Sequence, residues 1–149
     1  GEGNVTRFAE FNFYADPEAV HYVLESGVEI ELLPWDACLL HRFTRQAIEE
    51  FGVSAGRAKE LFDRLQGHIF EQTTKMFGTA VVMHADPFAM ACALDPSVVS
   101  RRLVTGLTME LNNTTMRGAS VRSEGTNVTA YMDLDMERYG EILRRIGEL

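Results

Sequence analysis

Two short segments of the chain carry polar side chains whose types and spacing suit the binding of a hydroxyl-rich ligand. In the first, Asn4 lies six residues before Glu10, and Phe11 and Asn12 follow directly. A carboxylate and two amides can together hydrogen-bond several hydroxyl groups. Glu10 and Asn12 would face the same side of an extended backbone. On composition alone, a polar strand edge among core aromatic residues explains the same pattern.

The second segment is His84-Ala85-Asp86-Pro87. Asp followed by Pro is typical of a helix start, where an acidic side chain is favoured, so a plain helix cap is the first interpretation of Asp86. A cap can also be a metal ligand, because a carboxylate has two oxygens. His84 is near enough to act as an acid or base, although a lone histidine is usually structural.

A third segment, residues 115–118 (TMRG), follows two asparagines that are typical of a turn. From the residues alone it is a turn with an exposed arginine. N-x-T patterns at Asn4, Asn113 and Asn127 match glycosylation acceptors, but so short a motif recurs by chance. No Walker loop, GxGxxG, HExxH or GxSxG motif is present.

Helices and strands alternate in the elements that must position these residues, which predicts the α/β class. Asp16 and Asp135 are expected to cap helices, and Ser54 a long one. The small-residue helix after Asp86 is apolar nearly all round and should be buried. We expect helices over residues 17–27, 36–51, 55–77, 87–94 and from 136 onward, and strands over 28–33, 103–111, 119–123 and 127–132. In the long helix the expected apolar positions are Ala58, Leu61, Phe62, Leu65, Ile69 and Phe70.

Length and composition indicate one globular domain, or part of one. The chain has 149 residues, 46% hydrophobic and 24% charged, with a net charge of −8. So acidic a chain is a poor candidate for binding nucleic acid. No apolar run suggests a membrane span or a signal peptide. Cys38 and Cys92 are interpreted as reduced, buried thiols, which favours a cytoplasmic location. The chain begins at Gly1 rather than Met, which suggests a removed leader or a piece of a longer protein.

Taken in order, the motifs resemble the inosine–uridine-type nucleoside hydrolase family. The family has an AEFN…DPEA segment with an Asn six residues before the Glu; residues 3–6 read GNVT and residues 9–19 read AEFNFYADPEA. Its DPxAxA…xDP helix is matched by residues 86–91 (DPFAMA) and 94–96 (LDP). Residues 115–118 resemble its late TRG turn, and residues 33–36 (LPWD) resemble animal-like members more than protozoan ones.

The resemblance implies an open, Rossmann-like α/β fold, a tightly bound Ca²⁺ and hydrolysis of the N-glycosidic bond of ribonucleosides. Asn4 and Glu10 would hold the 5′-hydroxyl end of the ribose, Asn12 would bind its 2′/3′ side, and Phe11 would line the pocket. Asp86 would touch the ribose and ligate Ca²⁺, which takes about six to eight oxygens. Carboxylate and amide oxygens would stabilise the positive charge of the oxocarbenium-like transition state.

The chain departs from the family pattern in two ways. It lacks the DxDxGxDD cluster, which supplies most metal ligands and the aspartate that activates water, and a threonine-containing loop that contributes a carbonyl. Residues 1–149 are therefore interpreted as the C-terminal portion of a single nucleoside hydrolase domain. Some members also place a His directly before the metal aspartate as leaving-group acid. Here Ala85 takes that place, and His84, one residue further back, is the candidate acid.

The sequence thus predicts a ribonucleoside hydrolase that acts together with a missing N-terminal half. The expected partners are a nucleoside or ribose and either the missing half or further copies of the chain, with no nucleic acid and no membrane. The alternative is a non-catalytic fragment or interaction module that retains the fold. The residues leave open whether purine or pyrimidine nucleosides are preferred.

Overall fold

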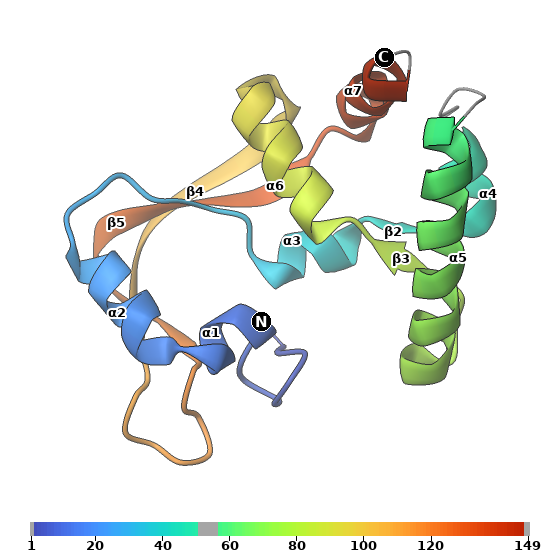
Figure 1. Ribbon diagram of the computed structural model, residues 1–149. Coiled ribbons are helices and arrows are strands. Elements are labelled where there is room, and N and C mark those ends of the chain that lie inside the picture. The colour runs from blue at the N-terminus through green and yellow to red at the C-terminus, as the bar shows by residue number, and fades with distance from the viewer. Residues whose placement is uncertain (1, 51–56, 148–149) are drawn as a thin grey trace. The chain divides into compact units, whose positions relative to one another are not determined.

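The computed structural model describes residues 2–50 and 57–147. The chain forms two compact units, each built from two stretches of sequence (Figure 1). The first unit comprises Gly1–Ala37 and Arg101–Asp133, and the second comprises Cys38–Ser100 and Leu134–Leu149. Helices and strands alternate along the chain, which confirms the α/β class. No helix in the described part of the chain combines the length and apolar character needed to cross a membrane.

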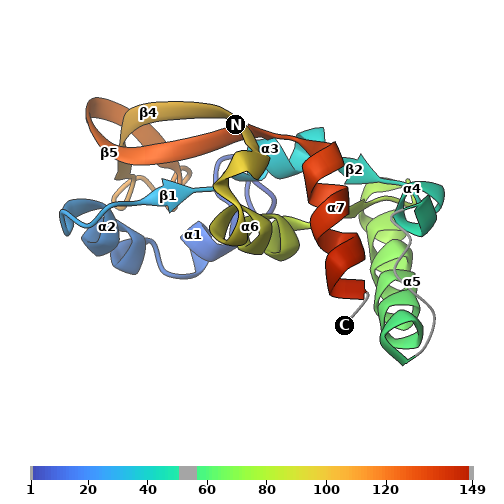
Figure 2. The same cartoon turned by 90° about the horizontal axis from the view of Figure 1, so that it is seen from above.

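The first unit is a three-stranded sheet covered by short helices. Its strands are β1 (Glu31–Leu32), β4 (Val99–Met109) and β5 (Ser120–Leu134), and its helices are α1 (Phe11–Ala15) and α2 (Pro17–Glu25). The strand order is β1-β5-β4, and β1 runs parallel to β5 (Figure 2). The core contains Leu24 from α2 and residues of β4 and β5: Met109, Val128 and Ala130.

One continuous strand, β5, replaces the two strands predicted over 119–123 and 127–132. Gly125, expected in a turn between them, lies within β5 with a φ of +117°, a conformation that favours glycine. The Asn127 side chain connects this irregular stretch to its neighbours. Its Nδ2 donates to the carbonyls of Leu24 (3.1 Å) and Leu107 (3.0 Å), and its Oδ1 accepts from the Leu107 N–H (2.8 Å). Asn127 therefore has a structural role.

The second unit is mainly helical, with a two-stranded antiparallel ribbon. Its core is aromatic: Phe88 and Tyr139 pack with ring centroids 4.6 Å apart, and Phe43 lies 6.2 Å from Tyr139. Its elements are β2 (Arg42–Phe43), α4 (Arg45–Glu50), α5 (Arg57–Phe77), β3 (Val82–Met83), α6 (Ala85–Leu94), the 3-10 turn η1 (Pro96–Val98) and α7 (Met136–Gly147), and α3 (Trp35–Leu40) ends in it.

The structure confirms two predicted caps and corrects several element boundaries. Asp16 Oδ1 accepts from the Ala19 N–H (2.9 Å), and Asp135 Oδ1 accepts from the Glu137 N–H (3.0 Å). The helix predicted over 36–51 is interrupted, because β2 pairs with β3, a distant partner that local periodicity does not reveal. The strand predicted over 28–33 is shortened to β1. Ser54 lies outside the described residues.

Two helices bury only some of the residues that the sequence predicted. In α5, Phe70 is buried as predicted, but Leu61 and Leu65 are 58% and 56% exposed, and the polar Gln66 is buried. In α6, Phe88 is buried, but the predicted burial on nearly all sides is wrong. Two of the apolar side chains of α6 are more than half exposed, Met90 and Leu94.

Candidate functional site

The first predicted group, Asn4, Glu10, Phe11 and Asn12, surrounds the start of α1. The backbone N–H of Phe11 donates to Asn4 Oδ1 (2.8 Å), and that of Asn12 donates to Glu10 Oε2 (2.9 Å). Both side chains satisfy amides that the first turn of a helix leaves without intrahelical partners. The structure therefore brings the four residues together, but on a helix start and not on the predicted extended backbone.

The loop before α1 is compact because of its own sequence. A Cβ at Gly3 would overlap the carbonyl oxygens of Thr6 and Ala9, so only glycine fits there. The Thr6 hydroxyl accepts from the N–H groups of Phe8 (3.2 Å) and Ala9 (3.0 Å). The Ala9 side chain is completely buried. These contacts hold Asn4 against the start of α1.

The outer side of α1 is open to solvent. The Phe11 ring is 60% exposed, Asn12 and Tyr14 are exposed, and Glu10 is half-buried. The arrangement thus offers an apolar ring beside an amide and a carboxylate. Such a surface can pack against the apolar side of a small ligand and hydrogen-bond its hydroxyl groups.

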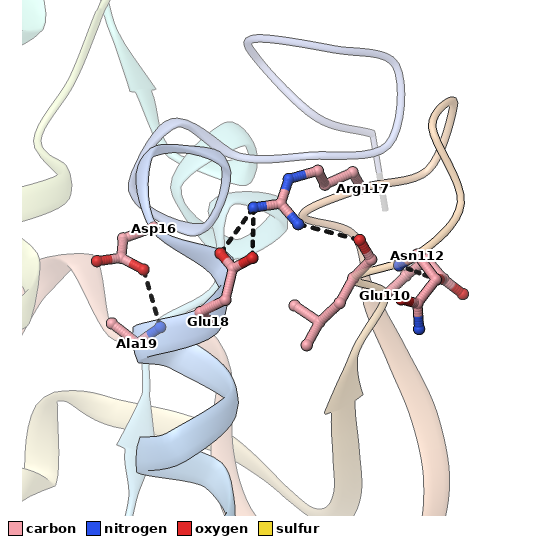
Figure 3. Close-up of polar contacts among 7 residues, drawn as sticks. Asp16, Glu18, Ala19, Glu110, Asn112 and Arg117 are labelled. Carbon is pink, nitrogen blue, oxygen red and sulfur yellow. Dashed lines mark hydrogen bonds and ion pairs between the residues drawn. The ribbon is translucent and has the colours of Figure 1, made fainter.

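The TMRG segment is anchored to this region through Arg117, which is more than an exposed turn residue. Arg117 Nη2 donates to both oxygens of Glu18 (2.6 and 2.7 Å), and Nη1 donates to the carbonyl of Leu111 (3.0 Å) (Figure 3). The Arg117 guanidinium holds the pKa of the Glu18 carboxyl below its usual range. The next residue, Gly118, has a φ of +82° and packs against the backbone of α1.

His84, in the second unit, lies in a buried polar cluster. Its Nδ1 is 2.8 Å from the Tyr139 hydroxyl, and its Nε2 is 3.3 Å from Gln66 Nε2. Only 4% of the residue is exposed, and Phe43 and Phe88 pack around the ring. With Gln66 assigned as donor to Nε2, the ring proton sits on Nδ1 and is donated to the Tyr139 oxygen. Both ring nitrogens are thus engaged within the core.

Burial also decides the charge of this cluster. Desolvation lowers the pKa of His84 to about 4 and raises the pKa of Tyr139, because low-dielectric surroundings disfavour the charged form of each group. At neutral pH His84 is therefore an uncharged ring, and Tyr139 is a neutral phenol. Such a cluster suits a structural role in the core.

Asp86 lies in the first turn of α6 and is exposed. The N-cap position is occupied by His84, whose side chain does not cap the helix, so the interpretation of Asp86 as the cap is wrong. Across residues 2–50 and 57–147, no group of three or more His, Cys, Asp or Glu side chains is arranged to hold a metal ion. Asp86 alone falls far short of the oxygens that Ca²⁺ requires.

The predicted site residues thus belong to two groups in two units: the α1 group in the first, and His84 with Asp86 in the second. The sequence did not reveal the partners of these residues, namely Glu18 for Arg117 and Gln66 with Tyr139 for His84. Nothing local in the sequence signals a pair 99 residues apart. Gln66 had one possible signal, since it is a polar residue among the apolar residues of a long helix.

Comparison with known proteins places most of the chain in one family. Residues 1–141 match the description "inosine-uridine preferring nucleoside hydrolase". The chain is 30% identical to the inosine-uridine preferring nucleoside hydrolase of Crithidia fasciculata, over 99% of this chain and 50% of that protein.

Solved structures share the fold. A purine-preferring ribonucleoside hydrolase from Gardnerella vaginalis superimposes with a TM-score of 0.86 at 20% identity, over 99% of this chain and 48% of that one. A plant nucleoside hydrolase gives a TM-score of 0.85 at 19% identity, over 98% and 49% of the two chains. The chain therefore spans about half the length of these relatives.

Proposed function

Because this chain belongs to the inosine-uridine preferring nucleoside hydrolase family, we propose that it forms the C-terminal portion of a ribonucleoside hydrolase domain. The reaction is hydrolysis of the N-glycosidic bond, which gives ribose and a free base. The observation that carries the proposal is the family match over residues 1–141. Within this range, the start of α1 brings together the four residues expected to bind ribose.

The proposed task of the α1 group is to bind and orient the ribose. Asn4 and Glu10 lie at the 5′-hydroxyl end, Asn12 on the 2′/3′ side, and the Phe11 ring packs against the sugar. Glu10 already uses one carboxylate oxygen to cap α1, which leaves its other oxygen for a hydroxyl. Its negative charge also favours the positive charge that develops on the sugar in an oxocarbenium-like transition state.

The metal and the attacking water depend on residues beyond this chain. Nucleoside hydrolases are in general metal-dependent, and we propose Ca²⁺ as the metal of the complete enzyme, with Asp86 as one ligand. The described residues do not form such a site by themselves. The role of His84 as leaving-group acid stays a prediction, and its buried, neutral ring would first have to exchange its bond to Tyr139 for one to the substrate.

Two surfaces support association with the missing half. In the first unit β1 is an edge strand of the sheet β1-β5-β4, and an open strand edge is prone to pairing. In the second unit, Met90 and Leu94 leave apolar surface of α6 exposed. We propose that the N-terminal half of the family domain pairs with the edge of β1 and covers the exposed apolar surface of α6. Further copies of the chain would be a second form of association.

Base release by the complete polypeptide that contains this sequence tests the proposal. Inosine and uridine are incubated with the wild type, with Asn12→Ala and with Gln72→Ala, an exposed amide on α5 that serves as a matched control. We expect release by the wild type and by Gln72→Ala, and a strongly reduced rate for Asn12→Ala. A folded wild-type protein that releases no base from either nucleoside would support the alternative, a non-catalytic protein that retains the fold.

A further inference from the structure

We propose that Arg117 and Glu18 are positioning residues for α1, which they hold in place through the loop between β4 and β5. The inference rests on the proposed function, because α1 carries residues proposed to bind ribose. Neither side chain is proposed to touch the substrate. Their role is to hold the segment that does.

The first step is the connection that Arg117 makes. One guanidinium joins the first turn of α2, through both oxygens of Glu18, to the carbonyl of Leu111 after the end of β4 (Figure 3). Because the guanidinium is planar and uses two of its nitrogens, Nη2 for Glu18 and Nη1 for Leu111, these contacts restrain orientation as well as distance. The loop is therefore tied to the start of α2.

The second step is that the loop is ordered by its own hydrogen bonds. The Glu110 carboxylate accepts from the N–H groups of Asn112 and Asn113 (both 2.9 Å). The Gly118 N–H donates to the carbonyl of Glu110 (2.9 Å). These bonds close the loop on itself, so that a displacement of Arg117 moves Gly118 with it.

The third step links the loop to α1. A Cβ placed on Gly118 would lie 3.1 Å from Tyr14 Cα and 3.3 Å from the Phe13 carbonyl oxygen and from Ala9 Cβ. The residue after Arg117 is thus packed directly on the backbone of α1 and on the Ala9 side chain of the loop before it. Asp16, which follows these contact residues in the chain, ends α1 and caps α2. Movement between α2 and the loop would therefore be passed to α1.

The solvent exposure of the Arg117 and Glu18 side chains favours a positioning role over a stabilising role for this ion pair. The side chains of Arg117 and Glu18 are 42% and 50% exposed, and ion pairs this exposed contribute little to stability. A substrate displaced by about 1 Å, by contrast, can react about 10²-fold more slowly. The Lys59–Asp63 pair on α5 is a matched control, because it is equally short (2.7 Å) and similarly exposed (45% and 55%).

The experiment compares Arg117→Gln, Glu18→Gln, the double variant and the control Asp63→Asn in the complete polypeptide. The readouts are kcat/KM for a ribonucleoside and for its 5′-deoxy analogue, which lacks the hydroxyl proposed to contact Asn4 and Glu10. We expect each single variant to lose about tenfold in kcat/KM and the double variant to lose no more than the worse single. The preference for the ribonucleoside over the analogue should fall. Asp63→Asn should keep both values.

A second readout does not depend on activity. In the complete polypeptide, the amide groups of Phe11 and Asn12 donate to Asn4 and Glu10, and their hydrogen exchange should be several-fold faster in Arg117→Gln than in Asp63→Asn. If the complete wild-type protein releases no base, the proposed function fails and exchange alone decides whether the pair holds α1. Unchanged exchange overturns the inference. So does faster exchange with unchanged kcat/KM in an active protein, because the pair would then be merely structural.

Discussion

The buried cluster of His84, Gln66 and Tyr139 should make the second unit sensitive to acid. An exposed histidine has a pKa of 6.5, and burial lowers that of His84 to about 4. Between about pH 4 and pH 6.5, the unfolded chain binds a proton at His84 that the folded chain does not bind. Folding stability therefore rises with pH, with its full value above pH 6.5, and falls progressively as the pH drops towards 4.

The size of the effect follows from the two pKa values. Each pH unit between 4 and 6.5 is worth about 1.36 kcal/mol, so the loss amounts to about 3 kcal/mol at most. That is a large part of the stability of an ordinary domain, about 5–15 kcal/mol. Acid also lowers the folding stability through the carboxylates whose pKa values are lowered in the folded chain: Glu18, Asp95 and Glu110. Their contribution cancels when two variants that share them are compared.

The assay is urea unfolding followed by far-UV circular dichroism at several pH values from 7.5 to 4.5. His84→Gln should be less stable at neutral pH and lose less stability on acidification, because it cannot bind the proton. Tyr139→Phe should lose about 1 kcal/mol through its missing hydrogen bond and keep the pH dependence. His68→Gln, a change at an exposed site on the same helix as Gln66, should behave like the wild type. Equal pH dependence in the wild type and His84→Gln would refute the reasoning.

Three further predictions concern the site and the state of the chain. In the complete protein, Glu10→Ala and Asn12→Ala should each lower kcat/KM by the equivalent of a few kcal/mol, because hydroxyl partners are left unpaired; wild-type kcat/KM in both would contradict the ribose-binding role. The isolated 149 residues should bind Ca²⁺ poorly in calorimetry, since Asp86 is one ligand where about six to eight oxygens are needed, and tight stoichiometric binding would contradict this and show that the chain holds further ligands. The same chain should self-associate in light scattering, and a stable monomer with cooperative melting would argue that its edges need no partner.

Features that depend on a few neighbouring residues could be predicted from the sequence. Asp16 and Asp135 cap helices as expected, because a capping side chain bonds to an amide only two or three residues further on. The α/β class follows from the alternation of helical and extended patterns. The order of the motifs also indicated the family, since such motifs are strings of adjacent residues.

Features that depend on distant residues were decided only by the tertiary structure. The pairing of β2 with β3 interrupts a predicted helix, and the side of α5 that is buried leaves Leu61 exposed while it buries Gln66. Periodicity shows that a helix has two faces, but what covers each face is contributed by other elements. Residue types likewise marked Glu10 and Asn12 as ligand candidates, yet their backbone conformation came from the compact loop before α1.

The contrast is sharpest for Arg117, which the sequence could present only as an exposed residue in a turn. Its partner, Glu18, is 99 residues away. A contact at that separation exists only once the fold has brought the loop between β4 and β5 beside α2. The sequence by itself determined which residues are present and the local conformations that they favour. The tertiary structure decided which of them meet, because contacts between distant residues form only when the whole chain packs around its cores.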